Sequence, residues 1–158
     1  MFEFLKKKEI PERSFAAVTS GYLMPLEKVK DEAFASKMLG EGVAIKPDGE
    51  YVVAPCRGTI SMLYPTLHAF GIRSDEGVDI LIHIGIDTVK FKGKGFKALK
   101  AQNDTVEPGD KIIRFDSYMM DQEKMDMTVM MLFPSFEEKL DVKTEGHVTR
   151  GRDIVACY

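Results

Sequence analysis

The sequence has few of the residues on which many functional sites depend. Its 158 residues include two cysteines, three histidines and no tryptophan. Cys56 and Cys157 are too few and too far apart for a disulfide framework, and no Cys-x-x-Cys pair is present for a zinc knuckle. Reduced thiols in a cytoplasmic protein are therefore expected.

Long apolar runs and a charge excess are also missing. No stretch approaches the roughly 20 apolar residues of a membrane span, and the basic start of the chain lacks the apolar region of a signal peptide. A net charge of −3 gives no reason to expect a nucleic-acid partner. The length, with 44% hydrophobic and 30% charged residues, predicts one globular domain with a single core.

Short β-prone runs between glycine turns are typical of an all-β chain. One pattern occurs twice, because Val-x-x-Gly followed by a pair of aliphatic residues spans both 106–113 and 148–155. Such spacing predicts an antiparallel β-sandwich or a barrel-like fold. Only short helices are expected, over Asp31–Leu39, Asp121–Met125 and Phe136–Leu140.

Two of the three histidines lie in a predicted hairpin. Thr66–Arg73 and Val78–Ile86 read as strands, and Ser74–Gly77 reads as a four-residue turn. In that register His68 lies directly opposite His83, so the two imidazoles share a face of the sheet. A slip of one residue would send them to opposite faces.

Alternation also predicts what surrounds the histidines. The isoleucines at even positions from 80 to 86 share a parity and are expected in the core. The histidine face would carry Phe70, Ile72 and Leu81, with Asp87 and Thr88 close to the pair. The alternative interpretation is two buried histidines with a purely structural role.

Seven motifs follow one another along the chain: Gly40–Pro47, Val53–Pro55, Gly58–Ile60, Thr66-x-His68-Ala69-Phe70, His83–Val89, Lys92-Gly93-x-Gly95-Phe96 and Val106-x-x-Gly109-Asp110. Any one of them is weak, but the ordered set with its spacing is highly specific. The sequence resembles the glucose-class enzyme IIA domain of the bacterial phosphoenolpyruvate-dependent sugar phosphotransferase system over roughly residues 19–116, and the resemblance thins after Asp116. The family's later strand appears here as Thr128–Met131, without its usual proline.

The resemblance implies a fold, a reaction and its partners. It implies a β-sandwich of two curved sheets over residues 14–158, preceded by a mobile leader over 1–13 that in some relatives is able to touch anionic lipid, here through 1–8. The alternative for 1–8 is a frayed terminus, because so short a helix is marginal by itself. A phosphoryl group would come from the histidine-containing phosphocarrier protein and pass to the IIB domain of a sugar permease. No cofactor is required, and some relatives also regulate other proteins.

The resemblance also implies residue roles. His83 would accept the phosphoryl group, and His68, held by the Thr66 hydroxyl, would support the transfer. Glu41 and Asp87 match acidic positions that flank the site and would meet arginines of the donor. The candidates for an apolar contact ring are Val43, Ile45, Phe70, Ile84 and Val89, although parity places Ile84 in the core.

Two other classes remain open at this level. A zinc hydrolase of related β architecture could use His68 and His83 with His147 as a third ligand, although no HxH or HExxH motif is present. The histidine pair could also bind zinc when a partner supplies a carboxylate. In a lipoyl- or biotinyl-like carrier, Lys124 in Glu-Lys-Met would be the modified residue.

Overall fold

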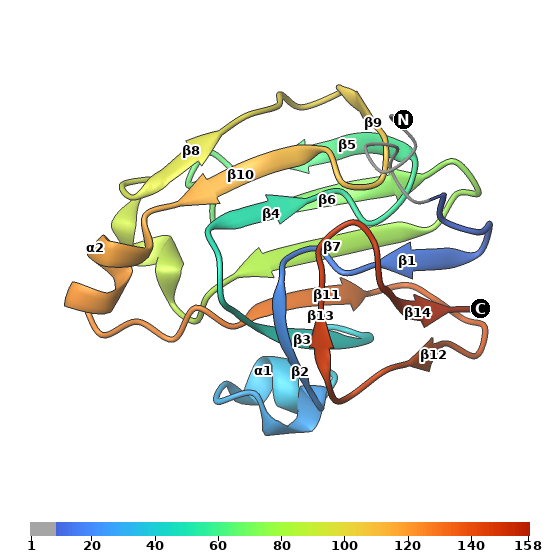
Figure 1. The fold of residues 1–158 in the computed structure, drawn as a ribbon, viewed down its shortest axis with the longest axis horizontal. Coiled ribbons are helices and arrows are strands. Elements are labelled where there is room, and N and C mark those ends of the chain that lie inside the picture. Colours follow the sequence, from blue (N-terminus) through green and yellow to red (C-terminus); the bar gives the residue numbers. More distant parts are fainter. Residues whose placement is uncertain (1–8) are drawn as a thin grey trace, which may run out of the picture.

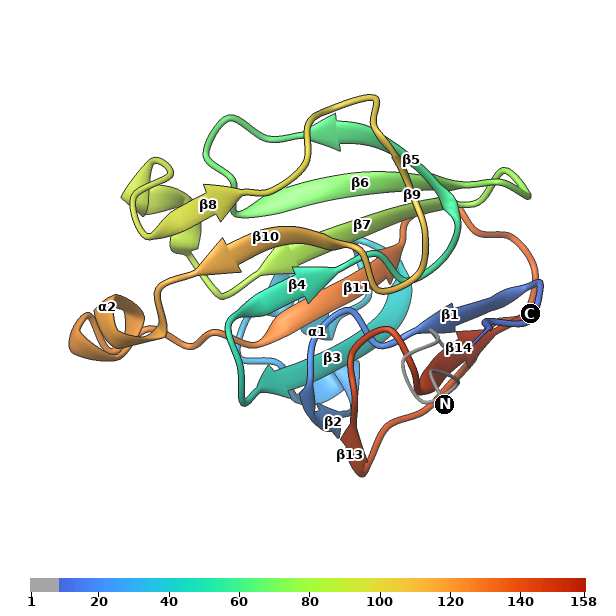
Figure 2. The same ribbon diagram turned by 45° about the horizontal axis from the view of Figure 1, so that its top comes forward.

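The computed structural model describes residues 9–158 and confirms an all-β architecture. Residues 1–8, where we expect the lipid contact, lie outside the described residues. All strand pairs are antiparallel, and they form three sheets where two were expected (Figures 1 and 2). No sheet within residues 9–158 closes into a barrel.

The largest sheet has eight strands and carries the histidine hairpin. In spatial order the strands are β13 (His147–Val148), β2 (Gly21–Met24), β3 (Glu41–Pro47), β11 (Val129–Phe133), β7 (Asp79–Ile84), β6 (Ala69–Ser74), β5 (Gly58–Leu63) and β9 (Thr105–Val106).

Two three-stranded sheets complete the fold. One contains β4 (Tyr51–Val53), β10 (Lys111–Phe115) and β8 (Phe96–Ala98), and the other contains β1 (Ser14–Ala16), β14 (Ile154–Cys157) and β12 (Asp141–Val142). In the third sheet the register between β1 and β14 shifts between Phe15 and Ala16. Beyond this shift the chain bonds irregularly to the β4 region, where Ala16 N–H donates to the Pro55 carbonyl.

Helical segments are short. They are the 3₁₀ helices η2 (Leu26–Lys28) and η3 (Thr88–Phe91) and the α-helices α1 (Glu32–Ala35) and α2 (Ser117–Gln122). The Asp31 carboxylate caps α1 by accepting from Ala33 N–H, but α1 ends well before Leu39. The helical turn expected at Phe136–Leu140 is wrong, since that described segment is irregular. None of the helices between residues 9 and 158 has the length and apolarity needed to cross a membrane.

The main core lies between the large sheet and the β4–β10–β8 sheet, and it contains residues of both, such as Ile72 of β6 and Ile113 of β10. Ile80, Ile82 and Ile84 of β7 point into it and are almost fully buried, as their parity predicts. A second cluster covers the other face of the large sheet, where Phe34 of α1 packs with Met130 of β11. Because β11 is covered on both faces, all five of its residues are buried and apolar.

The sequence repeat has a structural counterpart. Its two Gly turns touch, and a Cβ placed on Gly151 would lie 2.7 Å from the Cα of Gly109. Gly151 also has φ +70°, which disfavours any side chain there. The repeated pattern therefore marks two turns that pack against each other.

Candidate active site

The hairpin that carries the histidines has a shorter loop than its sequence predicts. Ser74 N–H donates to the Val78 carbonyl, and the Ser74 hydroxyl accepts from Val78 N–H at 2.9 Å. Ser74 therefore belongs to β6, which leaves a three-residue loop ending in Gly77 at φ +89°. The register shifts by one residue, and Ala69, not His68, pairs with His83. The predicted direct opposition of the two histidines is wrong.

The two imidazoles nevertheless lie side by side. Their ring centroids are 5.0 Å apart with an interplanar angle of 80°. His68 precedes β6 and follows Leu67, whose φ of 58° turns the chain. Strand alternation therefore does not fix the direction of the His68 side chain. The turn at Leu67 therefore allows His68 to lie beside His83 although the strand register differs by one residue from the predicted one.

The histidine pair lies on the outer face of the large sheet, away from the main core. Phe34 of α1 lies 4.9 Å from the ring of His83, and Tyr64 lies 5.6 Å from the ring of His68. Tyr64 thus contacts His68, His68 contacts His83, and His83 contacts Phe34. The sequence places Phe34 on the apolar stripe of a helix, but it does not show that this helix packs on the hairpin.

The protonation of His83 follows from its hydrogen bond. Its Nδ1 lies 3.0 Å from the Gly85 carbonyl oxygen, which can only accept. Nδ1 therefore carries the proton of the neutral ring, and Nε2 keeps a free lone pair. Burial, reinforced by the neighbouring His68, lowers the pKa of His83 to about 4. The ring is neutral near pH 7 and can act as a nucleophile.

The Gly85 carbonyl is held by a tight turn. Gly85 has φ +80°, and a Cβ at this position would lie 2.5 Å from Cγ2 of Thr88. The Thr88 side chain is fully buried, and its hydroxyl donates to the Ile84 carbonyl. Thr88 thus fixes the turn that orients His83, and its hydroxyl has no direct bond to either imidazole.

His68 has a hydroxyl partner. Thr66 Oγ1 lies 2.6 Å from His68 Nδ1. When the hydroxyl donates, the proton of neutral His68 is on Nε2, where it can be offered to an anion. Burial lowers the pKa of His68 as well. A nucleophilic ring thus lies beside a ring that can donate a hydrogen bond.

Comparison with known proteins agrees with this geometry. The model of the family described as phosphoenolpyruvate-dependent sugar phosphotransferase system, EIIA 1, matches residues 13–139. The chain belongs to this family. It is a phosphotransferase component, a phosphocarrier of the sugar phosphotransferase system.

Two EIIA relatives show how far the similarity extends. The glucose-specific EIIA component of Buchnera aphidicola subsp. Baizongia pistaciae (strain Bp) is 38% identical over 140 residues, which are 88% of this chain and 83% of the relative. The solved glucose permease IIA from Mycoplasma capricolum is 34% identical and superposes with a TM-score of 0.81, covering 99% of this chain and 98% of the other.

The carboxylates that act electrostatically on His83 are Asp87, which was expected there, and Asp31, which was not. Asp87 is exposed at the start of η3, whereas Asp31 caps α1, as its sequence position predicts, but its nearness to His83 is not predicted from the sequence. Glu41 lies three residues, or roughly 10 Å, along β3 from the level of His83, and β11 lies between these two strands. It forms an ion pair with Lys37 at 3.1 Å, and its expected role in binding a partner stays a prediction.

The predicted apolar contact ring also needs correction. Val43, Ile45 and Phe70 are at most 1% exposed and belong to the main core. The one-residue shift explains Phe70, because it now pairs with Ile82 and shares its inward face. Ile84 is buried as its parity predicts, and Val89 is 50% exposed.

The residues that would support the alternative classes lie elsewhere. His147 is on β13, four strands from β7 and therefore roughly 19 Å away, and its Nε2 lies 2.7 Å from Asp48. It cannot complete a metal site with His68 and His83. Lys124 follows α2 and is not at a hairpin tip. Among residues 9–158 no three His, Cys, Asp or Glu side chains are grouped to hold a metal ion.

Proposed function

We propose that His83 Nε2 accepts a phosphoryl group from the histidine-containing phosphocarrier protein and passes it to a cysteine on the IIB domain of a sugar permease. The observation that carries this proposal is the bond between Nδ1 and the Gly85 carbonyl, which leaves the Nε2 lone pair free. In the first step an N–P bond forms at Nε2 as the donor's N–P bond breaks. In the second step an S–P bond forms, and the lone pair returns to Nε2.

His68 supports the transfer. With Thr66 donating to its Nδ1, His68 offers Nε2–H to the phosphoryl oxygens, and the edge-to-face contact of the two rings allows one phosphoryl group to touch both. Preorganised donors of this kind stabilise the transferring group without reorganising during the step. In this proposal His83 is the nucleophile and His68 is the hydrogen-bond donor.

Donor and acceptor use the same face in turn, because in-line transfer at Nε2 admits one partner at a time. Val89 and Tyr64 are the exposed apolar neighbours, and Asp87 and Asp31 favour basic partners. The relatives are named for glucose, so a glucose-class sugar is proposed, with both partner domains reached in the cytoplasm. No cofactor is needed, and zinc would bind His68 and His83 only with a further carboxylate from a partner.

Labelling with phosphoenolpyruvate and the general carriers tests the two histidine roles. His83→Gln should take up no acid-labile phosphate, whereas His68→Gln should take it up and pass it on slowly. His147→Gln is the matched control, because His147 is distant from the site, and it should behave as the wild type. Labelling of His83→Gln but not of His68→Gln would reverse the roles.

The contact surface has its own test. Val89→Lys should weaken both donor and acceptor, and Asp87→Lys should slow association most at low salt, since screening reduces the effect of charge beyond a Debye length of ~10 Å. NMR shift mapping with each partner would show overlapping footprints around His83. Two separate footprints would exclude a shared face.

A further inference from the structure

Three cationic side chains surround one tyrosine far from the histidines. Lys111 Nζ lies 4.1 Å from the ring centroid of Tyr51, and the guanidinium carbons of Arg150 and Arg114 lie 5.3 and 5.6 Å from it. Lys97 extends the group, because it pairs directly with Arg114 across β8 and β10. We call this surface the basic face, and its members are Tyr51, Lys97, Lys111, Arg114 and Arg150.

The register shows that the basic face covers the outside of the β4–β10–β8 sheet. Tyr51 and Lys97 both pair with Arg114, and directly paired residues point to the same side of a sheet. Lys97, Lys111 and Arg114 are exposed. The inner side of this sheet packs on the core, whereas His83 lies on the outer side of the large sheet. The basic face and the histidine site therefore lie on opposite faces of the sandwich.

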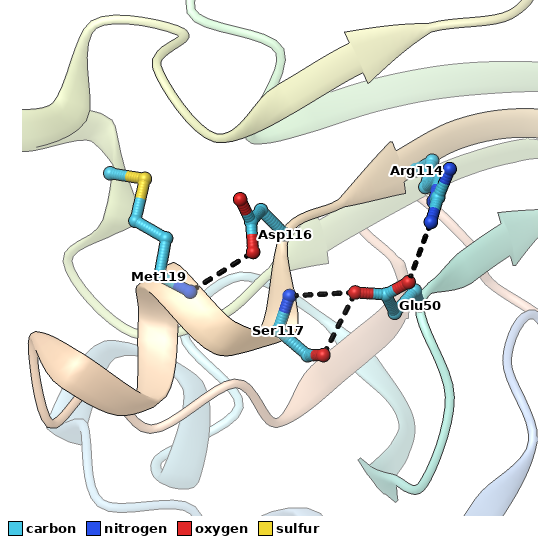
Figure 3. A network of polar contacts seen from close by, with 5 residues as sticks. All are labelled: Glu50, Arg114, Asp116, Ser117 and Met119. Atoms are coloured by element: carbon cyan, nitrogen blue, oxygen red, sulfur yellow. Dashed lines mark hydrogen bonds and ion pairs between the residues drawn. The ribbon is translucent and has the colours of Figure 1, made fainter.

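The fold itself does not account for so many cations. One cation over the half-buried ring of Tyr51 is favourable, but three like charges around one ring repel one another. Among the described residues 9–158, Arg114 alone of these cations has a carboxylate partner, Glu50 at 3.0 Å. Glu50 also accepts two hydrogen bonds from Ser117 (Figure 3). Within residues 9–158, Lys111 and Arg150 have no carboxylate within 4.0 Å.

We propose that the basic face binds the surface of an anionic lipid membrane. Its cations are spread over strands and a turn on an open sheet, which suits many headgroups in a plane. Leu99, just past the end of β8, is 37% exposed, and Tyr51 supplies an aromatic ring of the kind found at membrane interfaces. Binding through this face leaves the histidine site open to its partners.

Co-sedimentation of the full chain with vesicles tests the proposal. The wild type should bind vesicles of phosphatidylcholine and phosphatidylglycerol at low salt, and should not bind pure phosphatidylcholine. Lys111→Gln with Arg150→Gln should weaken binding by roughly thirty-fold, taking about 1 kcal/mol for each cation near an anionic surface. The matched control, Lys28→Gln with Lys30→Gln, removes two exposed lysines near α1 and should retain binding.

Three outcomes would overturn the proposal. The first is equal loss in both double variants, which would indicate net charge alone. The second is unchanged binding of the Lys111 and Arg150 variant, which would assign any binding to another segment, such as residues 1–8. The third is binding to soluble poly-glutamate but not to vesicles, which would indicate an acidic protein partner. Phosphoryl uptake by the same variants is measured separately, so failure here is distinguishable from failure of the histidine mechanism.

Discussion

The lowered pKa of His83 should make the protein lose stability in mild acid. The ordinary histidine pKa of 6.5 applies to the unfolded chain, and in the folded protein burial and His68 lower it to about 4. Between these values the unfolded chain binds a proton that the folded chain does not. Stability that is fully present above pH 6.5 is therefore lost as the pH falls towards 4.

The size of the effect follows from linkage. A shift of the His83 pKa from 6.5 to about 4 lowers the free energy of unfolding by about 3 kcal/mol once the pH is below both values. At pH 5 about 2 kcal/mol of it has been lost relative to pH 7.5. His83→Asn removes the titrating group but keeps an N–H that can donate to the Gly85 carbonyl, so it should lose about 2 kcal/mol less than the wild type over the same range.

Urea unfolding at pH 7.5 and pH 5 measures both proteins, and NMR titration of the His83 ring gives the pKa directly. The expected midpoint lies near 4. A midpoint at or above 6.5, or an equal loss of stability in the wild type and His83→Asn, would refute the argument that the ring is kept neutral by burial.

Three other substitutions test neighbouring parts of the structure. Thr66→Val should slow phosphoryl transfer from the protein about fivefold in single-turnover assays, the worth of one lost hydrogen bond of roughly 1 kcal/mol, whereas Thr66→Ser should stay near wild type. Gly85→Ala should lower the free energy of unfolding in urea by more than Gly77→Ala, because both have positive φ but only Gly85 lacks room for a Cβ; equal losses would contradict the clash with Thr88. Phe70→Ala should cost about 3–5 kcal/mol of stability in the same assay, as expected for a fully buried ring, and a stable variant with weakened partner binding would restore Phe70 to the contact surface.

Local sequence patterns predict much of this fold, because alternation and turn glycines depend on residues that are close in the sequence. Alternation in 78–86 identifies the buried side of β7, and the repeated Val-x-x-Gly pattern marks the two turns in contact at Gly109 and Gly151. The turn is where the sequence reading fails. Ser74 looks like a loop residue, but its hydroxyl binds Val78 N–H and extends the strand, so the register and the face of Phe70 both change.

The surroundings of the site depend on contacts between distant segments. Phe34 and Asp31 reach His83 only because the segment over 26–35 folds onto the outer face of the large sheet. Single-sequence periodicity shows that Asp31 caps a helix, but it carries no information about where that helix docks. Glu41 shows the converse, since it matches a motif and yet pairs with Lys37 away from the histidines.

The most direct test of the account is to locate the phosphoryl group on the protein. After phosphorylation by phosphoenolpyruvate and the general carriers, ¹⁵N and ³¹P NMR of the histidine rings identifies both the residue and the nitrogen. The structure predicts a single phosphoryl group on Nε2 of His83, with Nδ1 still protonated and bonded to the Gly85 carbonyl. Phosphorylation at Nδ1 of His83, or on His68, would contradict the central claim.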